Sequence, residues 1–196
     1  MINAVVFDFN GVFAESPEKA LMEKLCALKG IDPWIAWSNY YVKLWNFEKG
    51  RIEPIAFWKT VFPDLTDLEF STIVVEFYEK PLKRDEEVFF VAEKLAEKMP
   101  VYCISNSNFL QGKAYRKKNL YKGFKEFVLS HEIGKMKPFL GIFKYFLEKT
   151  GLKANKCLFI DDSRMNIIAA KLLGFKTIRF KDAEQLKERL KKFDIF

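Results

Sequence analysis

The alternation of short apolar runs with helical patterns is the feature that most constrains this chain. Five runs predict buried strands, at residues 4–9, 101–105, 127–130, 157–161 and 177–180. Between the later runs, apolar residues recur about every 3.6 positions, which is typical of helices that cover a sheet. Strands that alternate with helices favour a parallel sheet with helices on both faces. We therefore expect an α/β chain with a doubly wound, Rossmann-like parallel sheet.

One segment interrupts this alternation, because residues 15–80 carry helix signals and no convincing strand. Helix starts are predicted where a capping residue precedes proline or opens a capping box, at Ser16-Pro17, Asp32-Pro33, Glu53-Pro54 and Thr66–Glu69. A helical insertion directly after the first strand belongs over the carboxyl end of that strand, where a cap encloses substrate. The expected division is a core of residues 1–14 and 81–196 and an all-helical cap of residues 15–80.

The same insertion contains a stripe of aromatic residues. Trp34, Trp37, Tyr41 and Trp45 are spaced by three, four and four positions, so they share one face of a helix. Such a stripe usually belongs to a core, and we expect it to pack within the insertion. The alternative is that one or two of the rings face the crevice.

Composition limits the possible partners. The net charge of +7 comes from scattered lysines without a nucleic-acid motif, so no nucleic-acid partner is expected. The three cysteines form no close pair, which is typical of a reduced, intracellular protein. The chain begins in a strand without a leader, and no apolar run reaches membrane-spanning length. We expect a cytoplasmic protein with no membrane partner, and the pattern carries no signal for an oligomeric state.

Polar side chains follow the expected strands. They are Asp8 at the end of the first strand, Ser105 and then Asn106 at the end of the second, Lys137 in the loop after the third, and Asp161 and Asp162 at the end of the fourth. Open parallel sheets bind ligands outside the carboxyl ends of their strands, near the point where strand order reverses. We therefore expect these side chains to converge on one crevice.

Together these residue types suit phosphoryl chemistry. The Asp8 carboxylate can attack phosphorus and form an aspartyl-phosphate. The neighbouring Asp161 and Asp162 repel each other unless a cation is near, and Mg²⁺ prefers one or two carboxylates together with waters and substrate oxygens. The hydroxyl of Ser105 and nearby backbone N–H groups can hold phosphoryl oxygens. Lys137, with Pro138 expected at the first position of the next helix, can pair with Asp8 and with the phosphoryl group.

Each of these residues also has a purely structural interpretation. Asp8 can cap its loop, Ser105 and Asn106 can cap a helix, Lys137 can be an exposed loop residue, and one of Asp161 and Asp162 can cap the helix that begins near Ser163. The single histidine, His131, argues against a Ser-His-Asp triad and against a multi-histidine zinc site. No glycine pattern indicates a nucleotide cofactor.

Taken in order, the four motifs resemble the haloacid dehalogenase-like hydrolase superfamily, and the resemblance covers the whole chain. It implies that Asp8 is the nucleophile, Ser105 the second-motif hydroxyl, Lys137 the third-motif lysine and Asp162 the fourth-motif metal ligand. Three stretches are most similar to one branch of this superfamily, which includes bacterial sugar-1-phosphate phosphatases and the phosphatase domain of soluble epoxide hydrolases. They are residues 105–108, 130–138 and 159–162 with Asn166.

Asn10 is the departure from the family pattern. Phosphatases of the family usually have an aspartate there, which protonates the leaving oxygen and later activates water, and asparagine can do neither. Its backbone carbonyl can still bind Mg²⁺, as the resemblance implies. Loss of the acid favours leaving groups that need little protonation, such as an anomeric hydroxyl, an acyl group or a phenol. Dehalogenases also lack this acid but need no Mg²⁺, and the pair Asp161-Asp162 argues against them.

The predicted function is that of a Mg²⁺-dependent phosphatase of a small phosphorylated metabolite, with sugar phosphates as one option. The alternatives are a catalytically weak relative that binds a phosphorylated ligand or a protein partner, and a 2-haloacid dehalogenase. The predicted residues are Asp8, Asn10 and Lys137 for catalysis, Ser105, Asn106 and Lys137 for phosphate binding, and Asp8, Asn10, Asp161 and Asp162 for the metal.

Overall fold

A five-stranded parallel sheet forms the centre of the computed structural model, which describes residues 1–196. The strand order is β3-β2-β1-β4-β5. The strands are β1 (Ala4–Phe7), β2 (Val101–Ser105), β3 (Glu126–Leu129), β4 (Cys157–Asp161) and β5 (Lys176–Arg179). The predicted parallel, Rossmann-like sheet is confirmed. After β1 the chain adds β2 and β3 on one side, and it then returns to add β4 and β5 on the other side of β1. The first strand ends two residues earlier than expected, because the backbone turns away from the sheet after Asp8.

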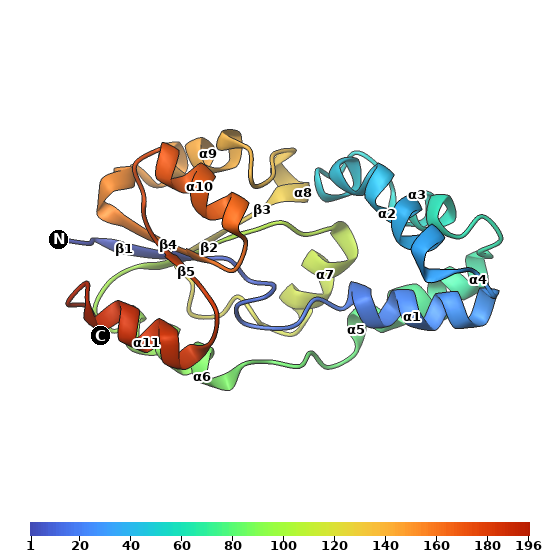
Figure 1. The fold of residues 1–196 in the computed structure, drawn as a ribbon, viewed down its shortest axis with the longest axis horizontal. Helices are drawn as coiled ribbons and strands as arrows, with labels where there is room; N and C mark the ends of the chain where they lie inside the picture. The colour runs from blue at the N-terminus through green and yellow to red at the C-terminus, as the bar shows by residue number, and fades with distance from the viewer.

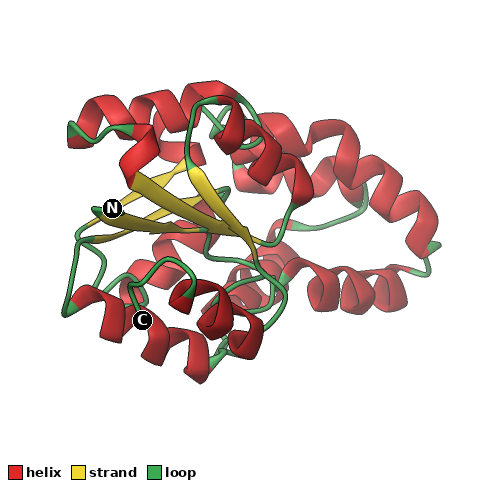
Figure 2. Ribbon diagram, turned by 60° about the vertical axis from the view of Figure 1, so that its left-hand side comes forward, coloured by secondary structure: helices red, strands yellow, loops and turns green.

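Helices cover both faces of this sheet (Figure 1). One face packs on α9 (Leu140–Thr150) and α10 (Arg164–Leu172), and the other on α6 (Glu86–Ala96) and α11 (Ala183–Lys191). The alternation of side chains along β1 serves both layers, since Val6 belongs to the first core and Phe7 to the second. The sheet therefore lies between two helical layers (Figure 2).

The remaining elements of this part are short or lie at the strand ends. They are α7 (Phe109–Lys117), α8 (Ser130–Ile133) and the 3₁₀ turn η2 (Ala154–Lys156). None of the helices in the structure combines the length and the apolar composition that crossing a bilayer requires.

All of the chain between β1 and α6 that has regular structure is helical. This helical insertion (Glu18–Glu79) contains α1 (Glu18–Lys29), α2 (Pro33–Glu48), α3 (Pro54–Val61), α4 (Asp67–Glu69), the π-helical segment η1 (Phe70–Val75) and α5 (Glu76–Glu79). It extends from the end of the sheet toward which the strands run (Figure 1). The predicted helix starts at Asp32-Pro33 and Glu53-Pro54 and the capping box of Thr66 are confirmed.

The first helix of the insertion begins one residue later than predicted. Pro17 is the capping residue of α1 instead of its first residue. The hydroxyl of Ser16 donates to the carboxylate of Glu18 and caps no backbone N–H group. Gly30 ends the helix, with a φ of 62°.

The aromatic stripe of α2 does not pack as predicted. Trp34, Tyr41 and Trp45 are 81%, 62% and 57% exposed, and Trp37 alone is half-buried. The expectation of packing within the insertion is therefore wrong for three of the four rings. The cause is that Tyr40 and Phe47, on the opposite side of α2, fill the interior of the insertion instead.

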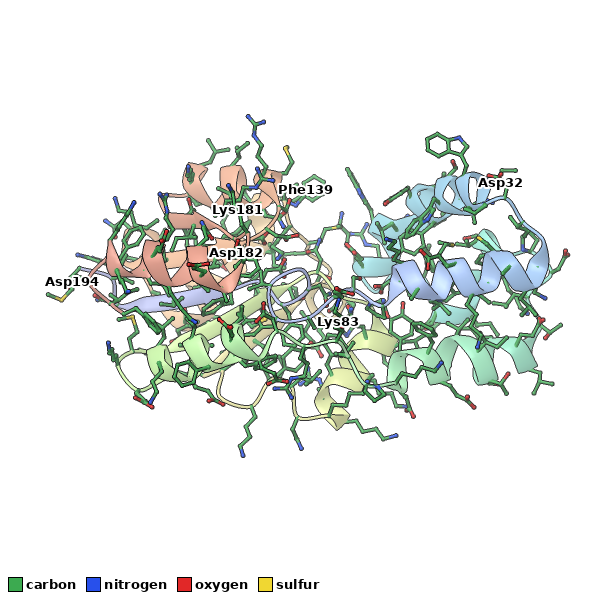
Figure 3. All side chains as sticks on the ribbon, turned by 60° about the horizontal axis from the view of Figure 1, so that its bottom comes forward. Asp32, Lys83, Phe139, Lys181, Asp182 and Asp194 are labelled. Carbon is green, nitrogen blue, oxygen red and sulfur yellow. The ribbon has the colours of Figure 1, made fainter.

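Two adjacent segments join the insertion to the sheet. Ala14 pairs with Arg84 in an antiparallel bridge, and the backbone N–H of Glu15 donates to the carbonyl of Lys83 at 3.2 Å. Lys83 lies at the junction between the two parts (Figure 3). Its ion pair with Glu15 is exposed on both sides, so it adds little stability.

Phe57 tests the interior of the insertion. Its ring is fully buried and stacks on Phe47 with centroids 3.9 Å apart. Replacing Phe57 with alanine should lower the free energy of unfolding by about 3–5 kcal/mol, because it removes buried apolar area and leaves a cavity. Urea unfolding followed by circular dichroism measures this. The control is Phe90→Ala on α6, where the ring is 51% exposed. Equal losses in the two variants would contradict this packing.

Candidate active site

The functional residues stand where three neighbouring strands end. Asp8 directly follows β1, Ser105 is the last residue of β2, and Asp161 is the last residue of β4. Both β2 and β4 pair with β1, so these residues share one edge of the sheet. Strand order reverses here, which is where open parallel sheets bind ligands. The helical insertion lies beyond the same edge (Figure 1).

A buried ion-pair network lies at the centre of this edge. The Nζ atom of Lys137 is 2.7 Å from Oδ1 of Asp8 and 2.8 Å from Oδ2 of Asp161. The Lys137 side chain is only 1% exposed. Burial opposes its charge, but Asp161 and Asp8 prevail and raise the pKa of Lys137 above its usual value. The ammonium therefore stays protonated and ties two strand ends together.

Asn106 fixes the backbone on which Lys137 stands. Its Oδ1 accepts from the Lys137 N–H at 2.8 Å, and its Nδ2 donates to the Lys137 carbonyl at 2.9 Å. The loop consequently runs past Pro138, and α9 begins only at Leu140 with Phe139 as its capping residue. The prediction that Pro138 opens the helix is therefore wrong.

Three carboxylates gather beside the Lys137 ammonium. One oxygen from each of Asp8, Asp161 and Asp162 lies within 4.8 Å of the others. Asp161 also accepts from the N–H of Ser163 at 2.8 Å and from Nδ2 of Asn166 at 3.0 Å, so it orients the start of α10. The helix-capping interpretation therefore applies to Asp161, while Asp162 is exposed to solvent.

The cluster contains more negative charge than its lysine offsets. Burial raises the pKa of Asp8, Lys137 opposes this, and Asp161 and Asp162 add to it. Partial desolvation beside the cluster also raises the pKa of Asp162, although this side chain is exposed on the outside, and Asp161 adds to that shift. Three carboxylates against one ammonium leave an excess negative charge that a divalent cation would offset. Because carboxylate oxygens are the ligands that Mg²⁺ prefers, the donor set fits this metal.

Gly11 makes this arrangement sterically possible. Its φ is +79°, a left-handed conformation that favours glycine. A Cβ atom at this position would lie 2.6 Å from Oδ2 of Asp162. Any side chain there would therefore displace the outermost carboxylate of the cluster.

Asn10 is held by a residue that lies far away in the sequence. Its Oδ1 accepts from the hydroxyl of Tyr115 on α7 at 3.1 Å, and that hydroxyl also accepts from Nε2 of Gln111 at 3.1 Å. The amide thus has a fixed orientation but no acidic proton. Sequence analysis missed Tyr115, because 105 positions separate it from Asn10 and no motif joins them.

The helical insertion also supplies polar groups to the crevice. Oε2 of Glu48, at the end of α2, accepts from Nδ2 of Asn106 at 3.1 Å. Burial raises the pKa of Glu48 to about 7, and the charge of Glu18 contributes to the shift. Glu18 is buried on α1, where it accepts from the Tyr78 hydroxyl at 3.0 Å. Neither glutamate belongs to a recognisable motif, so sequence reasoning missed both.

His131 lies outside the site. Its Nδ1 is 2.9 Å from Oγ of Ser107, and its ring packs so closely on Gly112 that a Cβ there would be 2.5 Å from Cε1. Burial lowers the pKa of this imidazole. His131 is therefore a packed residue held by Ser107 and Gly112.

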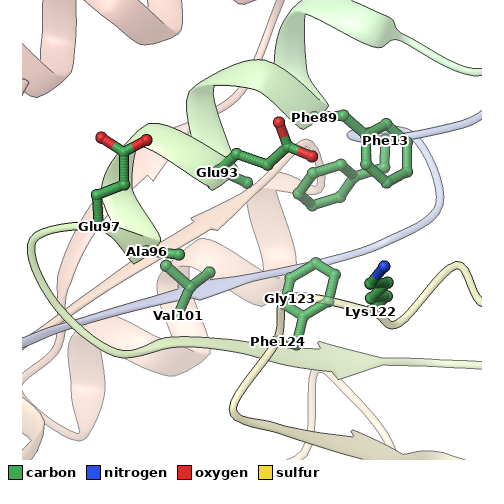
Figure 4. A pocket seen from close by; sticks show the side chains of 10 residues that line it. Phe13, Phe89, Glu93, Ala96, Glu97, Val101, Lys122, Gly123 and Phe124 are labelled. Atoms are coloured by element: carbon green, nitrogen blue, oxygen red, sulfur yellow. The ribbon is translucent and has the colours of Figure 1, made fainter.

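One cavity adjoins the acid cluster. It measures about 650 Å³ and is lined by core residues Asn10, Gly11 and Asp162 and by Ser16, Lys19 and Glu23 of the insertion side. A more apolar cavity of about 320 Å³, lined by Phe13, Phe89 and Phe124, lies against α6 (Figure 4). It contains none of the predicted site residues, so the first cavity is the one that can bring a ligand to Asp8.

Comparison with known proteins agrees with this geometry. A family model described as haloacid dehalogenase-like hydrolase matches residues 2–174. The chain belongs to this hydrolase family. The resemblance predicted from the four motifs is therefore confirmed, as is the prediction of a hydrolase.

Individual relatives are more distant. A D-ribitol-5-phosphate phosphatase from Bacteroides thetaiotaomicron is 24% identical over 204 residues, which is 97% of each chain. A haloacid dehalogenase-like enzyme of the same organism, solved with magnesium and inorganic phosphate, has a TM-score of 0.77 and 23% identity over 93% of this chain and 96% of that one. An L-2-haloacid dehalogenase from Xanthobacter autotrophicus has a TM-score of 0.68 and 19% identity over 100% and 85% of the two chains. At these identities the two solved structures share the fold.

Glu48 makes stability depend on pH. The folded chain raises its pKa from 4.5 to about 7, so its charged form costs stability; this cost is absent below pH 4.5 and complete above about pH 7. Glu48→Gln should therefore be as stable as the parent at pH 4 and more stable at pH 8. Thermal unfolding across this range measures the difference. Glu188→Gln, at an exposed position on α11, is the control. A gain at pH 8 no larger than that at pH 4 would contradict the raised pKa.

Proposed function

We propose that this protein is a Mg²⁺-dependent phosphatase of small phosphorylated metabolites, with sugar and polyol phosphates as its substrate class. The observation that carries the proposal is the Asp8 carboxylate at the end of β1, between the Lys137 ammonium and two further acids. The relative that acts on ribitol 5-phosphate and the neighbour that binds magnesium and phosphate support it.

Asp8 is oriented for nucleophilic attack. Its Oδ1 accepts from the N–H of Phe9 at 2.6 Å and pairs with Lys137 at 2.7 Å. In the proposed reaction a carboxylate oxygen of Asp8 forms a bond to phosphorus, and the bond from phosphorus to the leaving oxygen breaks. Water then attacks the phosphorus of the aspartyl-phosphate, which releases inorganic phosphate and restores the carboxylate. Solvent supplies the proton for the leaving oxygen, because Asn10 has none to give.

The metal would be held by oxygen atoms. Asp8, Asp162 and the backbone carbonyl of Asn10 are the proposed ligands, with Asp161 completing the acidic surroundings. When bound, Mg²⁺ offsets the negative charge of the carboxylates and of the phosphoryl group. Asp161 contributes mainly by holding Lys137, since both of its oxygens already accept hydrogen bonds from Lys137 or Asn166.

Lys137 and Ser105 are the proposed phosphate contacts. The ammonium of Lys137 faces the nucleophile, and the hydroxyl of Ser105, 1% exposed, stands at the adjacent strand end. For Asn106 we propose another role than the phosphate binding that its position suggested. Its amide already binds Lys137 and Glu48, so we propose that it positions the lysine, with phosphate contact left to its backbone.

The helical insertion is the proposed cap, spanning residues 15–80, on a core of residues 1–14 and 81–196. Its first helix lines the cavity beside Asp162, and Glu48 reaches the core at Asn106. These contacts on two sides of the crevice would shield the reacting groups from bulk water and select among substrates.

Two alternative functions differ from a phosphatase in their chemistry. The dehalogenase shares the fold, but the Asp161-Asp162 pair beside Asp8 supplies cation ligands that halide displacement does not need. A catalytically weak protein that binds a phosphorylated ligand is favoured by one observation, the amide of Asn10 where the family has an acid.

Asp8→Asn tests the proposal. An amide cannot form the phosphoryl-enzyme, so phosphate release from a panel of sugar, polyol and aryl phosphates should fall to the background level. The parent should release phosphate from at least one compound, and chelation of divalent cations should abolish this. The control is Asp182→Asn, a helix cap on α11. Full activity in a folded Asp8→Asn variant, or activity of the parent in excess chelator, would refute the proposal.

Asn10→Asp tests the missing acid. The carboxylate would still accept from Tyr115, so the substitution should fold, and it supplies a proton to the leaving oxygen. Its rate should exceed the parent rate by about 10²–10⁴-fold on primary-alcohol phosphates and by less on aryl phosphates. Steady-state rates plotted against the pKa of the leaving group measure this. An equal effect on every substrate would show that proton transfer is not what Asn10 limits.

A further inference from the structure

The helix α2 has two apolar sides, and only one of them is buried in the structure. Ala36, Tyr40 and Phe47 face the interior of the insertion. On the opposite side lie the residues that we call the α2 aromatic face, Trp34, Ile35, Tyr41, Val42 and Trp45, with exposures of 81%, 56%, 62%, 74% and 57%. A contiguous exposed apolar patch of this kind normally marks a contact surface. The α2 aromatic face therefore lacks its cover in the isolated chain.

The geometry of a helix makes this face continuous. Trp34, Tyr41 and Trp45 are spaced by seven and four positions and align along the helix axis, and Ile35 and Val42 align beside them. Ser38 lies between the two rows, and its hydroxyl donates to the carbonyl of Trp34 at 2.8 Å. Because this hydroxyl is already satisfied, covering Ser38 leaves no unpaired donor at that position.

The exposed aromatic area supplies a large part of what a stable contact needs. Phe139 of the core extends the face, since its ring packs on Trp45 with centroids 5.2 Å apart and lies close to the insertion (Figure 3). With exposures of 81%, 62%, 57% and 43%, the rings of Trp34, Tyr41, Trp45 and Phe139 leave on the order of 500 Å² in water. The largest patch on a typical monomer is about 300–600 Å², and a stable dimer buries about 800 Å² per partner. The aliphatic residues and a polar rim supply the remainder.

We propose that this face binds a second copy of the chain, with α2 packed antiparallel on α2 about a two-fold axis. In such a dimer the residue number rises along one α2 while it falls along the other. A residue therefore faces the partner residue for which the two numbers add up to a fixed sum. A sum of 79 pairs Trp34 with Trp45 of the partner subunit, and Ser38 with Tyr41 of the partner subunit. Large residues then meet at the two ends, while at the centre the small Ser38 leaves room for a tyrosine ring.

The charges around the face favour this orientation. The chain carries a net charge of +7, so two copies repel each other overall, and an uncharged surface opposes their contact least. The centre of the face has no charged side chain, and Lys49 stands at its end, with Nζ 4.9 Å above the ring of Phe139. Antiparallel packing brings Lys49 toward Asp32 of the partner subunit, at the outer end of the insertion in Figure 3. Parallel packing would instead place two lysines together.

The first test is the mass of the protein in solution. Sedimentation equilibrium should show a dimer for the parent. Trp34→Glu and Tyr41→Glu should each raise the dissociation constant at least about thirtyfold, because each removes a large ring and buries a charge in the interface, the first toward its end and the second at its centre. These side chains are exposed, so the variants should keep the circular dichroism and unfolding midpoint of the parent. The control is Leu172→Glu, at a residue 74% exposed on α10.

The second test fixes the register. The three native cysteines are buried, so cysteines placed on α2 react selectively. When a Ser38→Cys chain is mixed with a Tyr41→Cys chain under oxidising conditions, the disulfide-linked heterodimer should exceed both linked homodimers. A monomeric parent, a dimer that survives Trp34→Glu and Tyr41→Glu, or equal loss in Leu172→Glu would each overturn the proposal. Binding of a monomeric parent to lipid vesicles, lost in both variants, would assign the face to a membrane surface and also overturn it.

Discussion

The ion pairs of Lys137 are the interaction on which the site depends. A buried ammonium and two buried carboxylates are each costly alone, and they are tolerable here because the ammonium lies within 3 Å of both carboxylates. The network therefore fixes the relative position of the ends of β1 and β4 and of the loop after β3. The positions of the other site residues follow from it, since Asn106 holds the backbone of the lysine and Asn166 holds Asp161.

The network also explains how one edge of a sheet can be both rigid and acidic. Its inner part consists of Asp161 and Lys137, which pair with each other and are almost fully buried. Its outer part is Asp162, which is exposed beside Gly11. Rigidity therefore comes from the inner pair, while the outer acid stays in contact with solvent and is one of the ligands in the proposed metal site.

Sequence reasoning succeeded where a residue's role follows from its position at a strand end. The apolar runs located all five strands, and the polar residues that follow them meet at one edge because parallel strands bring their carboxyl ends together. It failed where the role depends on packing between distant segments. Tyr115 beside Asn10 and Glu48 beside Asn106 have no local signal. The aromatic stripe misled because periodicity shows that residues share a face and does not show which face is buried.

The number of residues in the π-helical segment η1 determines which way the helix that follows it faces. A π turn contains one residue more than an α turn, so everything after Val75 is rotated by about 100° relative to an uninterrupted α-helix. That rotation directs Tyr78 inward, where its hydroxyl meets Glu18 and Asn108. Loss of a single residue within 70–75 would turn this tyrosine away even if every remaining residue were kept. In this segment the number of residues therefore matters more for the direction of Tyr78 than the identity of each residue.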